Sequence, residues 1–174
     1  MPASGKSTLA RLLSKETRCP LLSRDELKEG YTNTLGIPHS EMDNSVAMHI
    51  YESFFEAAEL LLSKGISIII EAAFQDKLWR PKLLALSHKA AIKIIICKTI
   101  PGLVKERFTN RLLNDPGREK YHGDSLWHST KERNGWPEEY EPVKMDVPLL
   151  EVDTSQNYQP GLQEIIQFIG LKNK

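Results

Sequence analysis

The sequence lacks a surplus of charge, a framework of cysteines and any long apolar run. Its 23 basic residues balance 23 acidic ones, so no global positive field draws the chain to nucleic acid or to an anionic membrane. Its two cysteines, Cys19 and Cys97, form neither a metal motif nor a disulfide framework, which favours the cytoplasm. The longest aliphatic runs, 68–70 and 94–96, are far too short to span a bilayer. We therefore expect one soluble domain over residues 1–174.

Segments with helical periodicity alternate with short aliphatic runs along the whole chain. The aliphatic runs do not alternate with polar residues, which is typical of parallel strands buried on both faces. This order predicts an α/β fold with a parallel sheet covered by helices on both sides. We expect strands over 19–22, 66–72, 91–97 and 147–152, and helices over 5–16, 41–64, 80–90, 101–113, 124–134 and 160–169. A further helix starts after Ser23, where Ser23 and Glu26 have the spacing of a capping box.

The most informative motif lies near the start, where Ala3-Ser4-Gly5-Lys6-Ser7-Thr8 matches the second half of the P-loop pattern G-x-x-x-x-G-K-[ST]. In such a loop the backbone N–H groups and Lys6 hold the phosphates of ATP, and the hydroxyl of Ser7 holds Mg²⁺. The alternative is a Gly-Lys-Ser turn that opens an ordinary helix. The alternation of strands and helices that follows favours the nucleotide site.

The opening glycine of this motif and the strand that delivers it would fall before Met1. We expect the natural protein to begin upstream with a hydrophobic strand that ends in glycine. Without that strand the sheet would lose its central buried residues, and the chain as written would fold poorly.

The run Pro2-Ala3-Ser4-Gly5-Lys6-Ser7-Thr8-Leu9-Ala10, followed by Ser23-Arg24-Asp25-Glu26, resembles the small P-loop kinases of the AAA-domain type. That group is similar to the 5′-kinase domain of polynucleotide kinase, to zeta toxins and to chloramphenicol phosphotransferase. The resemblance extends from Met1 to Leu171. It implies a three-layer P-loop NTPase kinase core with the strand order 2-3-1-4-5, of which strand 1 is missing here, and ATP-dependent phosphoryl transfer to a hydroxyl group.

The resemblance makes Asp25 the catalytic carboxylate that accepts the proton of the attacking hydroxyl. Its alternative role is to complement a helix N-terminus. Arg24 and Lys28 are expected to contact the substrate beside Asp25. In polynucleotide kinases an arginine three residues after this aspartate holds the phosphate of the substrate, and Lys28 keeps its charge without the bidentate fork. Together with the zero net charge, this leaves nucleic acid a possible acceptor that is not favoured.

Glu71 ends an aliphatic run, at the position where P-loop proteins place the acid that reaches Mg²⁺ through water. Its alternative role is to pair with a neighbouring lysine. Phe74 and Trp79 follow it and are expected in the core rather than beside the acceptor. Trp127 and Trp136 are expected to be core anchors as well, and His122 and His128 lack the spacing of a zinc pair.

Arg107 and Arg111 are four residues apart, and hence on one face of a helix, which is the spacing of the lid arginines in the similar kinases. Such a pair stabilises the charge of the transferred phosphoryl group, whereas the alternative is a solvated helix face. Arg118 is a third candidate in a lid region of about 107–123, or else a surface loop residue. The resemblance places the loop at Asp153 against the adenine, and its alternative is to cap a turn.

These residues predict a kinase that moves the γ-phosphoryl group of ATP, with Mg²⁺, to a hydroxyl of a small molecule or of a nucleotide or polynucleotide end. One alternative is an ATP-binding protein without transfer activity, either regulatory or a remnant. Another is a toxin that phosphorylates a nucleotide sugar. The sequence leaves the acceptor and the oligomeric state open.

Overall fold

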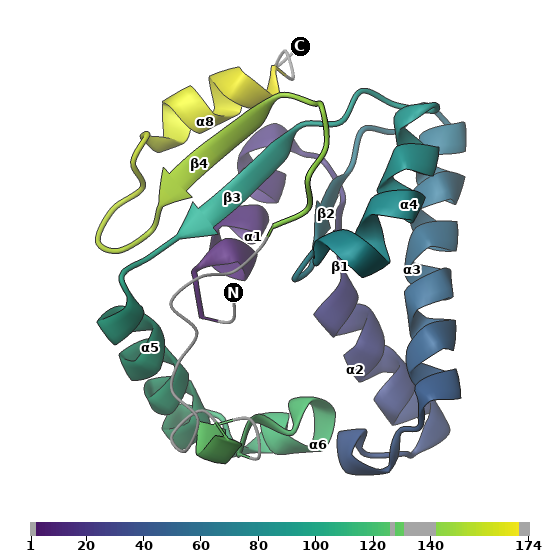
Figure 1. Cartoon of the computed structure of the whole chain (residues 1–174), viewed down its shortest axis with the longest axis vertical. Helices are drawn as coiled ribbons and strands as arrows, with labels where there is room; N and C mark the ends of the chain where they lie inside the picture. The colour runs from purple at the N-terminus through teal and green to yellow at the C-terminus, as the bar shows by residue number, and fades with distance from the viewer. Residues whose placement is uncertain (1–2, 126–127, 131–141, 171–174) are drawn as a thin grey trace.

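Two pairs of parallel strands form the middle layer of the computed structural model, which describes residues 3–125, 128–130 and 142–170 (Figure 1). β1 (Leu21–Ser23) pairs with β2 (Ile69–Glu71), and β3 (Ile94–Lys98) pairs with β4 (Leu149–Asp153). Within the described residues the two pairs share no backbone ladder. The order agrees with the expected 2-3-1-4-5 arrangement, in which strand 1 would separate the pairs.

The helices lie close to the segments that periodicity predicts. α4 begins earlier than expected, and the expected loop at 115–118 is a short 3₁₀ turn followed by one more helical turn. Residues 124–125 and 128–130 are helical. The rest of the helix expected over 124–134, which includes Trp127, lies outside the described residues, and so does Trp136. The elements are α1 (Lys6–Thr17), α2 (Arg24–Leu35), η1 (His39–Glu41), α3 (Asn44–Ser63), α4 (Asp76–Ser87), α5 (Pro101–Asn114), η2 (Pro116–Arg118), α6 (Glu119–His122) and α8 (Leu162–Ile169).

Successive residues of the strands pack into two different hydrophobic clusters, one on each face of the sheet. Ile68 and Ile70 contact the cluster built by α3 and α4, while Ile69 contacts the cluster built by α1, β4 and α8. Ile94 and Ile95 divide between the same two clusters. This division is the three-layer architecture that the aliphatic runs predict.

The cluster built by α3 and α4 contains several aromatic residues, among them Trp79, which was expected in the core. Trp79 is buried and makes edge contacts with Tyr51, Phe54 and Phe74. Trp79 and Phe74 therefore belong to the core, as expected, and do not line the functional cavity.

The predicted capping box at the start of α2 is wrong. Ser23 makes no side-chain cap, and its Oγ donates instead to Glu71 Oε2 at 2.9 Å. The reason is the register of the sheet, because Ser23 and Glu71 are direct neighbours at the ends of β1 and β2. The hydroxyl of Ser23 donates to this buried carboxylate, whereas a cap would require its oxygen to accept from a backbone N–H group of α2.

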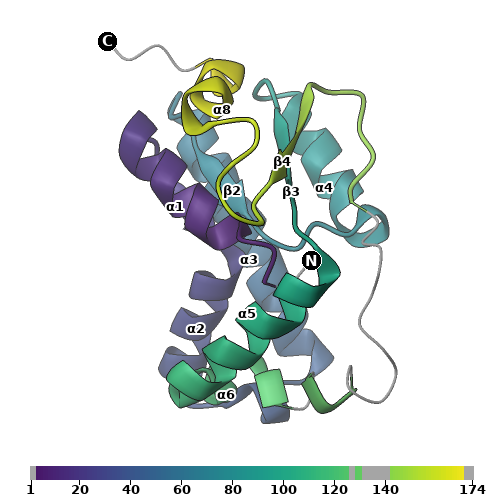
Figure 2. The ribbon, with the colours of Figure 1, turned by 90° about the vertical axis from the view of Figure 1, so that its left-hand side faces the viewer.

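Both views place α2, α5 and α6 beyond the carboxyl ends of the strands (Figure 1 and Figure 2). In parallel α/β sheets this edge is where ligands bind, because loops and helix N-termini converge there. No helix in the described part of the chain combines the length and the apolar character needed to cross a membrane.

Candidate active site

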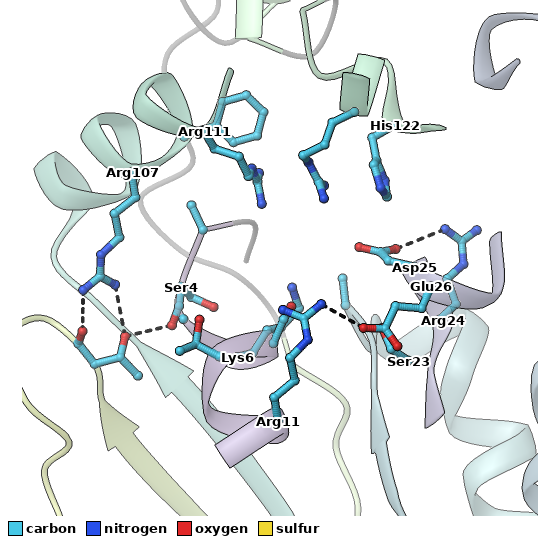
Figure 3. Close-up of a pocket in the computed structure, with 18 of the residues that line it drawn as sticks. Ser4, Lys6, Arg11, Ser23, Arg24, Asp25, Glu26, Arg107, Arg111 and His122 are labelled. Carbon is cyan, nitrogen blue, oxygen red and sulfur yellow. Dashed lines mark hydrogen bonds and ion pairs between the residues drawn. The ribbon is translucent and has the colours of Figure 1, made fainter. Parts of the chain in front are cut away.

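A cavity of about 1020 Å³ opens at the carboxyl edge of the strands. Its walls come from the P-loop and α1, from α2, from α5 and the lid, and from the loop between β4 and α8. Figure 3 shows the P-loop and α1 on one side, and Arg111 and His122 reaching in from the lid on the opposite side. Most of the site residues proposed from the sequence thus line one space, whereas Glu71 and Asp153 are not among its lining residues.

The P-loop enters α1 through Gly5, which has φ of 79°. A Cβ atom at Gly5 would lie 3.0 Å from Thr154 Oγ1, so this position requires glycine for its backbone angle and for its close approach. Thr154 Oγ1 donates to Ser4 O at 2.8 Å, and Ser4 is buried. A residue of the β4–α8 loop therefore fixes the loop that would cradle the phosphates.

Lys6, Ser7 and Glu71 meet at the start of α1. Lys6 Nζ lies 3.4 Å from Glu71 Oε1, and Ser7 Oγ donates to the same oxygen at 3.2 Å. Ser23 donates to the second oxygen of the carboxylate, which is 5% exposed. The structure thus shows the pairing of Glu71 with a lysine that was its alternative role, and it also places the hydroxyl of Ser7 against the same carboxylate.

These oxygens fit a magnesium ion bound together with a nucleotide. Mg²⁺ prefers oxygen ligands, and in such sites it takes one or two from the protein and the rest from phosphates and water. The hydroxyl of Ser7 would supply one such ligand, and the carboxylate of Glu71, which contacts that hydroxyl, would reach the ion through a bound water. Within the described residues no group of three or more His, Cys, Asp or Glu side chains could hold a metal by itself, so phosphates would have to complete the set.

Asp25 lies near the N-terminus of α2 and faces the cavity from the side opposite the β4–α8 loop (Figure 3). Its carboxylate is 3.6 Å from Arg24 Nη1. Burial raises the pKa of Asp25, but the charges of His122, Lys6, Arg24 and Lys28 outweigh burial and bring that pKa below its usual value. Asp25 is therefore ionised at neutral pH and able to accept a proton.

Lys28 lies one turn after Asp25 on α2 and is only 6% exposed. Its Nζ is 2.7 Å from Nδ1 of His39 in η1. Burial, together with the charge of Arg24, lowers the pKa of Lys28 to about 8, although Asp25, Asp124 and Glu29 act in the opposite direction. No motif indicates this pairing in advance, because Lys28 and His39 lie on different elements.

The lid contributes Arg111, Arg118 and His122. Arg118 Nε donates to Asp124 Oδ2 at 3.2 Å, and Arg111 Nε lies 3.9 Å from the same oxygen. His122 Nε2 is 2.7 Å from Glu29 Oε1, which joins the lid to α2. Tyr121 extends this contact by donating to Asn33 at 3.0 Å, so the lid rests against the helix that carries Asp25.

Arg107 differs from Arg111 in its partners, although both belong to α5. Its Nη2 donates to Thr154 O at 2.6 Å and to Ser155 O at 3.1 Å, so it is directed at the β4–α8 loop (Figure 3). Asp153 accepts from Ser155 N at 2.7 Å and caps a turn in that loop. The cavity wall here is formed by residues that follow, among them Gln156, Asn157 and Tyr158, which sequence reasoning missed.

The comparisons with known proteins agree with this architecture. A family model described as an AAA domain matches residues 1–133, so the chain belongs to this family. Among curated proteins no sequence matches the chain. A "putative kinase" from Chloroflexus aurantiacus has a similar solved structure, with 26% identity, a TM-score of 0.78 and coverage of 99% of this chain and 94% of that chain.

Two further solved structures share the fold. A sugar kinase from Janibacter sp. HTCC2649 has 16% identity and a TM-score of 0.63, with coverage of 97% of this chain and 90% of that chain. A gluconokinase from Sinorhizobium meliloti 1021 has 19% identity and a TM-score of 0.50, with coverage of 97% and 86%. Fold, P-loop and family together define a small P-loop kinase of the AAA type.

Proposed function

We propose that this protein transfers the γ-phosphoryl group of ATP, in the presence of Mg²⁺, to a hydroxyl group of a small molecule. The observation that carries the proposal is the shared cavity. It brings together Lys6 and Ser7, where we place the phosphates, the carboxylate of Asp25, and Arg111, which reaches in from the lid. A phosphoryl donor, an acceptor and a stabilising cation would then meet in one place.

The P-loop amides and Lys6 bind the β- and γ-phosphates, and Lys6 exchanges its contact with Glu71 for the phosphate oxygens. Ser7 and Glu71 are the residues that would hold Mg²⁺. When bound, the ion neutralises charge on the phosphates and helps to orient them. The β4–α8 loop and Arg107 close the nucleotide end of the cavity.

In the transfer step the acceptor oxygen forms a bond to the γ-phosphorus, and the bond from that phosphorus to the β–γ bridging oxygen breaks. ADP leaves with the electron pair of the broken bond. The proton of the acceptor hydroxyl passes to the carboxylate of Asp25 and from there to solvent. Arg111, with Arg118, stabilises the charge that spreads over the phosphoryl oxygens during the transfer.

The proposal is tested by measuring ADP formation with a panel of acceptors that includes neutral polyols, sugar acids, sugar phosphates, nucleotide sugars and an oligonucleotide with a free 5′-hydroxyl. We expect ADP formation that depends on one class of acceptor, together with a phosphorylated product detected by mass spectrometry. ATP binding with no product from any acceptor would instead support the alternative of a nucleotide-binding protein without transfer activity. A product from the nucleotide sugar would support the toxin-like alternative.

The proposed metal site predicts a specific change in magnesium dependence. Replacing Glu71 by Gln should raise the Mg²⁺ concentration for half-maximal activity by about 10- to 100-fold, because outer-sphere carboxylates typically contribute that much. Ser7→Ala should act in the same direction. The controls are Glu59→Gln, at an exposed ion pair with Lys89, and Ser14→Ala, at a hydroxyl of α1 that bonds Cys19 O. An unchanged Mg²⁺ titration in both site variants would contradict the assignment.

A further inference from the structure

Lys28 is a buried cation in the wall of the cavity. Its side chain is among the few charged groups of the described residues that are less than a tenth exposed, yet it lines the same space as Asp25. The two residues are three positions apart on α2 and therefore share a face, with Cβ atoms about 5–6 Å apart. A molecule whose hydroxyl reaches Asp25 is within reach of Lys28.

The hydrogen-bond partner of Lys28 carries no opposite charge. His39 Nδ1 accepts one of the three protons of the ammonium group, and this histidine carries no negative charge. In the described part of the chain Lys28 forms no ion pair with a carboxylate, whereas Lys6 pairs with Glu71 and Arg118 with Asp124. The carboxylates of Asp25, Asp124 and Glu29 act on Lys28 only from beyond ion-pair distance, so an anion in direct contact would stabilise its buried charge further.

Arg24, one turn before Lys28 on α2, provides a second buried donor that lacks an acceptor within the described residues. Its Nε is buried and has no hydrogen-bond partner among the residues that the structure describes. Its Nη1 reaches Asp25 Oδ1 at only 3.6 Å, beyond hydrogen-bond distance. Buried polar groups in folded proteins are nearly always satisfied, so an unsatisfied one in a cavity wall indicates a bound partner. The Lys28 ammonium and the Arg24 guanidinium are both hydrogen-bond donors, and they lie on either side of Asp25 in the sequence of α2.

Given the proposed function, we infer that the acceptor carries an anionic group, a carboxylate or a phosphate, which Lys28 and Arg24 bind while its hydroxyl reaches Asp25. A carboxylate or phosphate oxygen accepts the remaining protons of the Lys28 ammonium and of the Arg24 guanidinium. A neutral polyol would accept hydrogen bonds but would leave the buried charge of Lys28 without a counter-ion. Because Lys28 and Asp25 are neighbours on one face of α2, the hydroxyl and the anionic group of the acceptor must lie close together.

The inference is tested by binding, so that it does not depend on catalysis. The probes are three matched series, each on one carbon chain with a carboxylate, a phosphate or neither: glycerate, glycerol 3-phosphate and glycerol; gluconate, glucitol 6-phosphate and glucitol; and lactate, propane-1,2-diol 1-phosphate and propane-1,2-diol. Dissociation constants are measured by calorimetry with Mg²⁺ and a non-hydrolysable ATP analogue present, so that the P-loop is occupied. We expect an anionic member to bind at least 10-fold more tightly than its neutral partner, and the series separate carboxylate from phosphate recognition.

Lys28→Met should weaken binding of that anionic probe by about 10- to 150-fold, because it removes a hydrogen bond between charged groups. Binding of the neutral partner should change little. Lys28→Arg should restore most of the affinity, and Lys89→Met, at an exposed lysine, should leave it unchanged. Thermal unfolding shows whether each variant is folded, and His39→Gln, which leaves the lysine in place, should retain the preference for the anion.

Equal affinity for anionic and neutral probes, equal weakening of both by Lys28→Met, or no binding by any anionic probe would overturn the inference. A neutral acceptor that is phosphorylated efficiently would also overturn it while leaving the proposed function intact. Selective anion binding without phosphoryl transfer would support the subsite and contradict the proposed function.

Discussion

Replacing Arg111 by glutamine should lower kcat by about 10³-fold or more and leave the affinity for ATP nearly unchanged, because an arginine that stabilises the transferred phosphoryl group is worth about 10³- to 10⁵-fold. Arg111 comes from α5 and points into the cavity in Figure 3. Its guanidinium carbon lies 4.8 Å from the ring centre of Phe108, and its Nε is buried with no hydrogen-bond partner in the described residues. Burial lowers the pKa of Arg111, but an arginine remains charged at neutral pH.

The contrast with Arg107 makes this prediction sharper. Arg107→Gln would remove the donors to the carbonyl groups of Thr154 and Ser155, so it should raise the KM for ATP by several fold with a small change in kcat. Arg111→Lys keeps the charge and loses the planar fork, and it should recover part of the rate. Steady-state kinetics and ATP calorimetry on the four proteins check the pattern. A rise in KM for ATP alone in Arg111→Gln would contradict the proposed role.

Asp25→Asn should lower kcat by about 10²- to 10⁴-fold, which is the usual contribution of a general base, while ATP binding is retained. Asparagine has nearly the same shape as aspartate but cannot accept the hydroxyl proton. The positive charges around Asp25 keep its pKa low, so at neutral pH the wild-type residue is already the carboxylate that the transfer requires. Single-turnover measurements would separate this chemical step from product release.

The matched control is Asp146→Asn, at an exposed residue in the segment before β4. Calorimetry with ATP and Mg²⁺ should give the same dissociation constant for both variants and for the wild type. Equal turnover of Asp25→Asn and wild-type protein would contradict the role of Asp25 as the base. The residue would then act at the helix N-terminus, as its alternative reading holds.

Much of the fold follows from local sequence patterns because buried parallel strands and amphipathic helices leave clear periodicities. The ends of the strands cannot be predicted from these local patterns. Ile66 is apolar and was expected in a strand, but it is 37% exposed and β2 begins at Ile69. The length of β2 is set by its partner β1, which provides only three residues to pair with, and that information is absent from the segment itself.

The site residues likewise divide into those that a sequence motif predicts and those whose contacts depend on the fold. The spacing of Arg107 and Arg111 places both on α5, but spacing gives no information on partners, and the carbonyl groups that Arg107 binds come from a loop nearly fifty residues later. His39 and Glu29, which contact Lys28 and His122, follow no motif and required the fold to reveal them. Ser23 was misread because a local capping pattern competes with a contact to Glu71 across neighbouring strands.

The hydroxyl of Thr154 touches Ser4 O, Lys98 O and Arg107 Nη1, which lie on the P-loop, β3 and α5. One atom therefore connects the helix that carries the lid to the loop that receives the phosphates. A displacement of α5 would therefore be transmitted through Thr154 to the loop proposed to bind the phosphates. The nucleotide site is in this sense mechanically coupled to its own cover.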